Sequence, residues 1–136
     1  MSNFSIGPNC RLTFYNEPES KVVHTGDNLV CRVLMDYYDK DTKKIKLEQY
    51  ANIEHTVYLK IFGHERIYGK PIETSTKDEE TESTAVYYLN FQLKQGQIVD
   101  FKETKNKLSL GLAHDLYPYE IIIKDEHRVD LEKNFV

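Results

Sequence analysis

The stretch ESKVVHTGDNLVCRVLMDY, residues 19–37, decides the fold. A two-valine stub at 22–23 precedes a Thr-Gly-Asp corner, and an almost continuous apolar run follows it. Val30 and Leu34 lie on one face of this run, so we expect a strand that is covered on both sides. Alternate positions predict its inward face, made of Leu29, Cys31, Val33, Met35 and Tyr37.

The corner itself is interpreted as structural. Gly26 supplies the conformational freedom that a tight turn needs, and Asp27 can accept hydrogen bonds from nearby backbone amides. His24 and Thr25 are polar and are expected to stay in water. A binding surface should therefore lie elsewhere in the chain.

Most of the remaining chain has the two-residue repeat of half-buried strands. CRLTFYN at 10–16 puts Cys10, Leu12 and Phe14 on one face, and Pro18 then interrupts the pattern. Further strands are expected over 56–63, 65–73, 85–93, 93–102 after a glycine turn, and 117–123, with a last edge strand in the tail 125–136.

Three segments do not follow this repeat. YDKDTKK at 38–44 predicts a polar loop, and the acidic stretch 73–84 predicts a solvated one. Segment 45–55, IKLEQYANIEH, fits either a strand with a bulge or a short helical turn, and both readings stay open.

About seven to nine short strands without a long amphipathic helix predict an all-β fold, an antiparallel immunoglobulin-like β-sandwich. With 136 residues, residues 1–136 are expected to form one domain with a core that needs no disulfide.

The net charge of −4 argues against a nucleic-acid partner, because no excess of basic residues is present to neutralise phosphates. The first ten residues lack the basic and apolar parts of a secretion signal, and no apolar run approaches the roughly 18 residues of a membrane span. We therefore expect a cytoplasmic protein that has no transmembrane segment and that acts peripherally at membranes.

No motif for catalysis, a metal or a cofactor is present. Cys10 and Cys31 lack zinc or redox spacing and are interpreted as buried thiols. None of the five histidines has a metal-binding spacing, and adjacent His114 and Asp115 would point to opposite faces of a strand. We therefore predict that the chain is not an enzyme; catalysis would need a pocket that joins His114 or His64 to acidic partners.

Two acidic clusters offer a different function. Their carboxylates could bind calcium if both loops met at one end of the sandwich, as in synaptotagmin-like phospholipid-binding modules. Three lysines interrupt the first cluster, which favours a solvated loop. A calcium-dependent phospholipid-binding module stays the alternative hypothesis. Its candidate ligands are Asp36, Asp39, Asp41, Asp78, Glu79, Glu80 and Glu82.

The order of these features resembles the N-terminal domain of the arrestin clan, especially its arrestin-domain-containing (α-arrestin) branch. RLTFYNEPESKVVHTGDNLVCRVLM carries the resemblance through Asn16, Pro18, Gly26, Asp27, Leu29 and Val33. VYLKIFGHERIY is similar to a family strand that ends in glycine, and LKQGQIVDF to a later segment. The chain departs from the pattern at Cys31, where the family usually has glycine, and it contains no PPxY motif or second arrestin domain.

The resemblance implies a non-catalytic adaptor or scaffold that binds cytoplasmic segments of membrane proteins in trafficking or signalling. Extended segments of that kind can add to a sheet edge or dock on a sheet face. In phosphate-sensing arrestins a basic residue near the first strand helps to read phosphopeptides. Arg11 matches that position and is the partner-binding residue that the resemblance implies.

Overall fold

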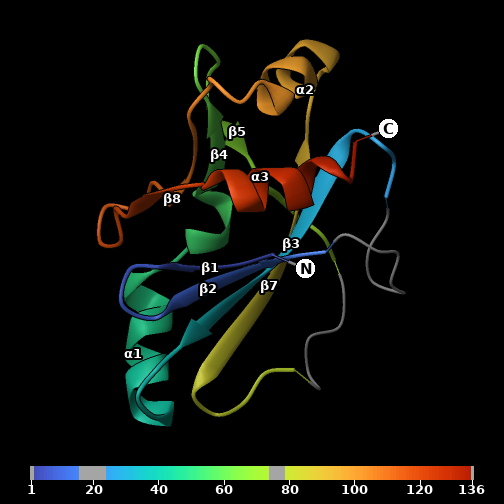
Figure 1. Ribbon diagram of the computed structural model, residues 1–136. Helices are drawn as coiled ribbons and strands as arrows, with labels where there is room; N and C mark the ends of the chain where they lie inside the picture. The colour runs from blue at the N-terminus through green and yellow to red at the C-terminus, as the bar shows by residue number, and fades with distance from the viewer. Residues whose placement is uncertain (1, 16–23, 74–78, 136) are drawn as a thin grey trace.

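The computed structural model describes residues 2–15, 24–73 and 79–135 (Figure 1). Within these ranges the chain is mostly β, and its nine strands form two antiparallel sheets. The five-stranded sheet has the order β1 (Ser2–Ile6), β2 (Cys10–Phe14), β3 (Asn28–Asp36), β7 (Thr84–Gln92) and β6 (Lys70–Pro71). The four-stranded sheet has the order β5 (Ile67–Tyr68), β4 (Val57–Ile61), β8 (Leu108–Leu112) and β9 (Glu120–Ile122).

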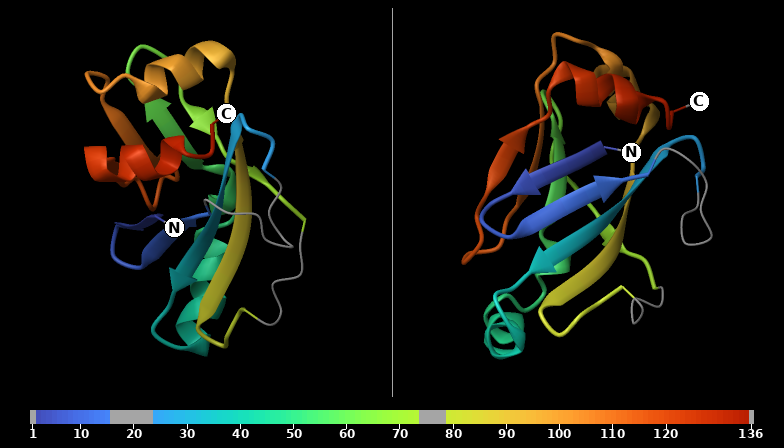
Figure 2. Two further views of the ribbon diagram at one scale, coloured as in Figure 1. Left: turned by 45° about the vertical axis from the view of Figure 1, so that its right-hand side comes forward. Right: turned by 60° about the horizontal axis from the view of Figure 1, so that its bottom comes forward.

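Three short α-helices and a 3-10 turn accompany the sheets. They are α1 (Lys40–Gln49), the 3-10 turn Ile53–His55, α2 (Gln95–Lys102) and α3 (Asp125–Glu132). Both views in Figure 2 place α2 and α3 together at one end of the molecule and α1 at the other. The prediction of two antiparallel sheets is confirmed, although the chain is not purely β.

The central strand β3 confirms the reading of its apolar run. It pairs with β7 along nine residues, from Asn28 opposite Gln92 to Asp36 opposite Thr84. Its inward residues are buried in the main core, whereas Val30 joins a second, smaller core on the other side of the sheet. The strand is therefore covered on both faces. Gly26 has a φ of 86°, as the corner requires, and the 22–23 stub lies outside the described residues.

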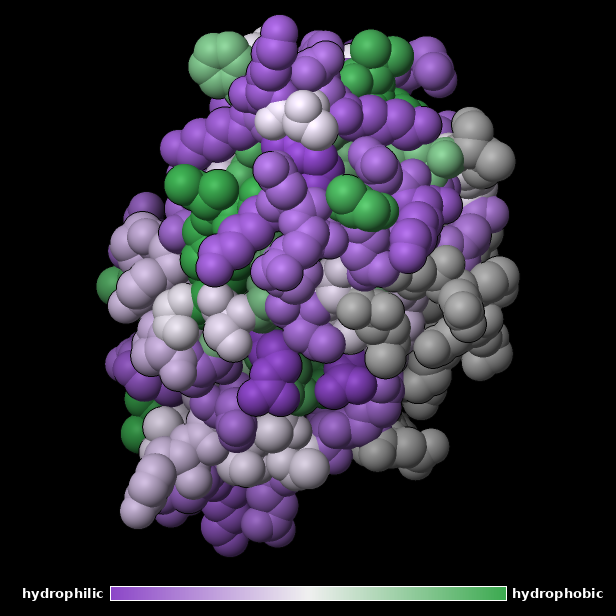
Figure 3. Space-filling view, viewed as in Figure 1, coloured by the Kyte–Doolittle hydropathy of each residue, from purple (hydrophilic) through white to green (hydrophobic). Residues whose placement is uncertain are grey.

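The main core fills the space between the two sheets, with fully buried side chains such as Phe14, Leu59 and Leu110. At the outer surface seen in Figure 3, hydrophobic residues form separate small groups in a mostly hydrophilic surface. This distribution is what the alternation of apolar and polar residues along the strands predicts.

The chain passes directly from one sheet to the other at Gly69, between β5 and β6. β5 pairs with β4, and β6 pairs with β7. A Cβ at Gly69 would lie 2.9 Å from Cζ of Phe91 and 3.0 Å from Cβ of Leu89. Glycine is therefore needed here, because the backbone crosses in close contact with the core. Segment 65–73 pairs with the preceding strand as predicted only over its first half.

Helix α1 corrects the prediction of a polar loop over 38–44, and it decides segment 45–55 in favour of a helix. Asp39 caps the helix, since its side chain accepts a hydrogen bond of 2.7 Å from the backbone N–H of Thr42. No residue of α1 is buried. The helix therefore lacks the apolar stripe by which a sequence pattern reveals a helix.

Helices α2 and α3 replace two predicted strands, in 93–102 and in the tail. In α2 the buried residues are Ile98 and Phe101, three positions apart, and this spacing is helical. In α3 the buried residues are Arg128 and Leu131, whereas Val129 is exposed. No strand is predicted before Cys10, yet β1 pairs with β2 there and forms the edge of the five-stranded sheet.

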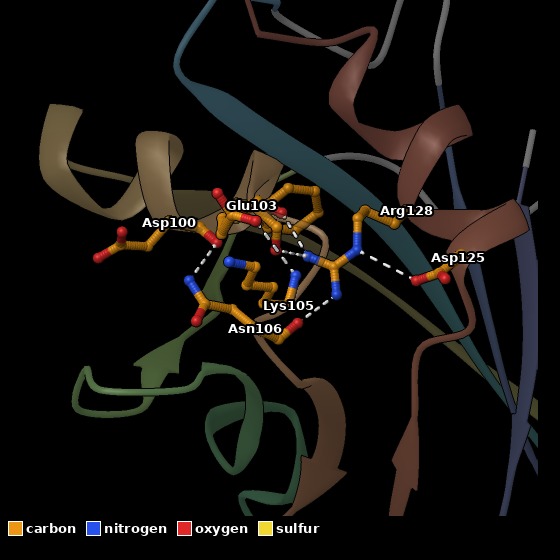
Figure 4. A network of polar contacts seen from close by, with 7 residues as sticks. Asp100, Glu103, Lys105, Asn106, Asp125 and Arg128 are labelled. Carbon is orange, nitrogen blue, oxygen red and sulfur yellow. Dashed lines mark hydrogen bonds and ion pairs between the residues drawn. The ribbon is translucent and has the colours of Figure 1, made fainter.

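Arg128 anchors α3 to the loop between α2 and β8 (Figure 4). Its Nη1 donates hydrogen bonds to the carbonyl oxygens of Phe101, at 2.6 Å, and Glu103, at 2.9 Å. Its Nη2 donates to the carbonyl oxygen of Asn106, and its Nε lies 3.6 Å from a carboxylate oxygen of Asp125. The buried charge is thus satisfied mainly by backbone carbonyls, as burial demands.

Candidate functional site

The candidate site lies on the outer face of the four-stranded sheet, where tyrosine rings, carboxylates and basic side chains lie together. Strands β4 and β8 turn alternate leucines, valines and isoleucines toward the core. The strand register then aligns the outward residues in two rows. One row contains Tyr68, Tyr58, Gly111 and Glu120, and the other contains Lys60, Ser109 and Ile122.

Tyr58 lies across Gly111 and reaches Glu120. Its hydroxyl donates a 2.5 Å hydrogen bond to Oε2 of Glu120. A Cβ at Gly111 would lie 2.5 Å from Cζ of Tyr58, so glycine leaves the space that the ring occupies. Burial, and then the hydrogen bond to Glu120, raise the pKa of Tyr58 to about 12. The hydroxyl therefore stays protonated and keeps its role as a donor at physiological pH.

Arg66 covers the other side of the Tyr58 ring. Its guanidinium carbon lies 4.1 Å from the ring centroid, which is a cation–π contact. A hydrogen bond with Tyr68 raises the pKa of the Arg66 guanidinium further above its ordinary value. The side chain is exposed but held by two tyrosines, so its charge has a fixed position on the sheet face.

Two open grooves meet at Arg66 and Glu120. The first, which we call the cationic groove, has a volume of about 260 Å³ and is lined by Lys60, Phe62, Arg66, Lys107, Ser109 and Glu120. The second, the aromatic groove, has a volume of about 500 Å³ and is lined by Tyr58, Arg66, Leu112, Ala113, His114, Asp115, Pro118, Tyr119 and Glu120. Together they form a continuous surface along β8.

The cationic groove has the opposite charge to the whole chain. Three basic side chains line it against the single carboxylate of Glu120, although the chain carries a net charge of −4. Phe62 adds an exposed ring at its rim, with 67% of its surface accessible. Arginine and lysine side chains that converge in this way bind carboxylates and other anions through charge-assisted hydrogen bonds.

We expect Gly111→Ala to lower the free energy of unfolding by about 2 kcal/mol, because the added methyl group forces the Tyr58 ring off the sheet. Chemical denaturation followed by circular dichroism measures this. Gly96→Ala is the matched control, since a Cβ at Gly96 in α2 would meet no atom within 4 Å. A Gly111→Ala variant as stable as Gly96→Ala would contradict the tight contact.

Arg11 lies apart from these grooves. It is exposed on β2, opposite Ser5 and Leu34, and points away from the core on the five-stranded sheet. It lines a separate cavity of about 200 Å³ together with Asp36. The structure does not bring Arg11 together with the basic residues of the cationic groove, and its partner-binding role stays a prediction.

The two histidines considered for catalysis have structural partners. Nε2 of His64 lies 2.6 Å from Oδ2 of Asp100, which joins the turn after β4 to α2. Nδ1 of His114 accepts a 3.1 Å hydrogen bond from the backbone N–H of Leu116. His114 also lines the aromatic groove beside Asp115.

Three acidic residues of the calcium hypothesis form local hydrogen bonds. Asp39 caps α1, Glu79 accepts a hydrogen bond from the hydroxyl of Tyr88, and Glu80 accepts one from the backbone N–H of Val86. Asp78 lies outside the described residues. In the ranges that the structure covers, no three His, Cys, Asp or Glu side chains gather as a metal site. The calcium alternative stays a prediction.

Cys10 and Cys31 are buried free thiols, as predicted. Burial raises the pKa of Cys10 to about 12 and that of Cys31 well above its ordinary value. Both thiols are therefore protonated and unreactive at neutral pH.

Sequence reasoning missed the outer face because its residues come from separate segments. One local signal was present in LSLGL, where apolar residues alternate with serine and glycine on the outward side of β8. Small outward residues in a strand indicate that something lies close above it. Here the Tyr58 ring lies above Gly111, and Ser109 lines the cationic groove.

Among the described residues, no helix has both the length and the apolar character needed to cross a membrane.

Comparison with known proteins gives the fold and a family. No curated protein matches the chain. A crystal structure described as a novel protein of unknown function from Burkholderia pseudomallei K96243 has a TM-score of 0.82 and 21% sequence identity. The match covers 98% of this chain and 83% of that chain, and at this identity it shows a shared fold. Residues 10–135 match the family described as protein of unknown function (DUF3501), so the chain belongs to this family.

Proposed function

We propose that the chain is a non-catalytic adaptor domain that binds an extended acidic segment of a partner protein on the outer face of its four-stranded sheet. The observation that carries this proposal is the convergence of Lys60, Arg66 and Lys107 on one groove of an acidic protein. Opposite charge attracts an acidic segment and orients it on arrival.

The shape of the surface favours a polypeptide over a small molecule. Sites for small molecules enclose most of the ligand, whereas both grooves here are open along a sheet face. An extended segment presents alternate side chains about 7 Å apart, which is also the spacing between the two rows of outward residues. The Arg66 guanidinium already lies over the Tyr58 ring, so less side-chain entropy is lost on binding.

The adaptor role agrees with the role that the arrestin-like resemblance implies. The relation of this sandwich to the arrestin domain, its action in the cytoplasm and a partner among the cytoplasmic tails of membrane proteins are parts of the same proposal.

We expect Lys60→Glu combined with Lys107→Glu to weaken the binding of an acidic peptide about tenfold or more, since two attractive contacts become repulsive. The probe is a fluorescein-labelled peptide of alternating glutamate and alanine, and the measurement is fluorescence anisotropy at two salt concentrations. Binding to the native chain should weaken at the higher salt concentration.

The matched control is Lys40→Glu with Lys44→Glu, which changes the net charge equally on exposed positions of α1. This control variant should bind the peptide with an affinity within about twofold of that of the native chain, because the altered charges are exposed and away from the groove. Absence of saturable binding to the native chain, or an equal loss in the control, would overturn the proposal. Loss in Arg11→Glu with none in the Lys60 and Lys107 variant would move the site to the five-stranded sheet.

A further inference from the structure

The aromatic groove differs in chemistry from the cationic groove beside it. Tyr58, Pro118 and Tyr119 form ring-bearing walls, and Tyr119 keeps 42% of its surface exposed. Two carboxylates, of Asp115 and Glu120, line the groove against the single guanidinium of Arg66. The balance of charge therefore changes sign between the two grooves.

Tyrosine rings next to a carboxylate are suited to a cation. The ring face attracts a positive charge, and a nearby carboxylate adds an ion pair. The Tyr58 ring lies over Gly111 and under the Arg66 guanidinium, so Tyr119 supplies the ring for a cation, and the exposed Asp115 supplies the carboxylate for an ion pair. A lysine or arginine side chain matches this lining.

The two grooves are arranged along one strand. Segment 107–113, which contains β8, passes from Lys107 and Ser109 in the cationic groove to Leu112 and Ala113 in the aromatic groove. Positions 109 and 113 are four residues apart, which is about 13 Å in an extended chain. A segment that lies along β8 would present side chains to both grooves from positions that are four residues apart.

We infer that the aromatic groove is a second subsite of the same surface, which takes a basic side chain four residues away from the acidic residue bound in the cationic groove. This inference rests on the proposed function. The partner is therefore an extended protein segment that carries charges of both signs at a fixed spacing. Continuity of the two grooves at Arg66 and Glu120 and their opposite charge both support this occupant.

The test compares labelled nine-residue peptides by fluorescence anisotropy. The first has glutamates at positions 3 and 4, lysine at position 8 and alanine elsewhere; the second has alanine at position 8; and the third has alanine at position 8 and lysine at position 6, two and three residues from the glutamates. A fourth peptide reverses the order of the first, because a segment can run along β8 in either direction. Lysine four residues from glutamate, in one of the two orders, should strengthen binding about fivefold over alanine.

Variants assign the gain to the groove. Asp115→Lys should abolish the advantage of lysine at position 8 and leave the affinity for the alanine peptide within about twofold. Tyr119→Ala should reduce the advantage, whereas Leu116→Ala, an exposed residue of the same hairpin, should not. Lys60→Glu with Lys107→Glu should weaken all four peptides.

The outcomes separate the two proposals. If no glutamate peptide binds, the proposed function fails and the second subsite fails with it. If the lysine and alanine peptides bind equally in both orders, and Asp115→Lys changes neither, the acidic-segment site stands and the second subsite is wrong. An equal gain from lysine at position 6 would also contradict the four-residue spacing.

Discussion

Replacement of Arg128 by methionine is expected to lower the free energy of unfolding by about 3 kcal/mol, because three backbone carbonyls lose their donor at once. The guanidinium is 3% exposed and donates to the carbonyl oxygens of Phe101, Glu103 and Asn106. Methionine preserves most of the packing volume, so the loss reports the hydrogen bonds rather than a cavity. Figure 4 shows how these acceptors surround the side chain.

Lysine at position 128 should give an intermediate loss. It keeps the positive charge, but its single ammonium group cannot reproduce the planar fork of donors that spans the three carbonyls. Urea denaturation followed by circular dichroism measures all variants. Lys133→Met is the control, because that lysine is on the surface and forms only a 3.8 Å ion pair with Asp130. A loss below about 1 kcal/mol in Arg128→Met would show that water replaces the guanidinium and that the network is not an anchor.

Gly7→Ala is expected to destabilise the chain by about 3 kcal/mol, from a left-handed backbone and a steric clash together. Gly7 has a φ of 69° in the turn between β1 and β2. A Cβ there would lie 2.7 Å from the hydroxyl oxygen of Tyr117. That hydroxyl accepts a hydrogen bond from the backbone N–H of Asn9 and lies 3.1 Å from the carbonyl oxygen of Ile6. The methyl group would push the ring out of this position.

Gly63→Ala separates the two causes. Gly63 has a φ of 87°, but a Cβ at that position would meet no atom within 4 Å, so the variant measures the backbone cost alone. The difference between the two glycine variants then gives the cost of the clash. Tyr117→Leu removes the hydroxyl and the ring atoms that a Cβ at position 7 would meet at 2.7–2.8 Å, and the double variant with Gly7→Ala should lose less than the sum of the two single losses. Strict additivity would contradict a direct contact between position 7 and the Tyr117 side chain.

The strands could be predicted where burial follows a two-residue repeat. β2 has this repeat, because one of its faces packs on the core between the sheets, whereas β3 and β7 are also buried on the other face, where Val30, Val86 and Tyr88 form the smaller core. Predicted strand 117–123 shrinks to three residues, since Tyr117 bends back to form a bridge with His114. The family match adds no function.

The helices could not be predicted in the same way. In α2 the β-branched pair Ile98-Val99 favours a strand, yet Ile98 and Phe101 are buried and Val99 is 58% exposed. In α3 one of the two buried positions is a charged residue, Arg128, whose burial depends on carbonyls from another segment. A hydropathy pattern contains no information about such acceptors.

The candidate site was beyond sequence reasoning for a related cause. Lys60, Arg66 and Lys107 each lie in a different segment, and only the pairing of β4 with β5 and β8 brings them to one face. The resemblance directed attention to Arg11 on the other sheet instead. Strand register is set by contacts across the core, so residues on an outward row become neighbours only once the sheet is known.

The crossing at Gly69 has a mechanical consequence for the sandwich. The continuous chain of β5 and β6 links the two sheets covalently at one edge. At the opposite edges, β1 and β9, the side chain of Tyr117 joins the two sheets, because its hydroxyl contacts Ile6 and Asn9. Side-chain hydrogen bonds are weaker than a covalent link. The sandwich is therefore tied covalently at one edge and by the hydrogen bonds of Tyr117 at the other.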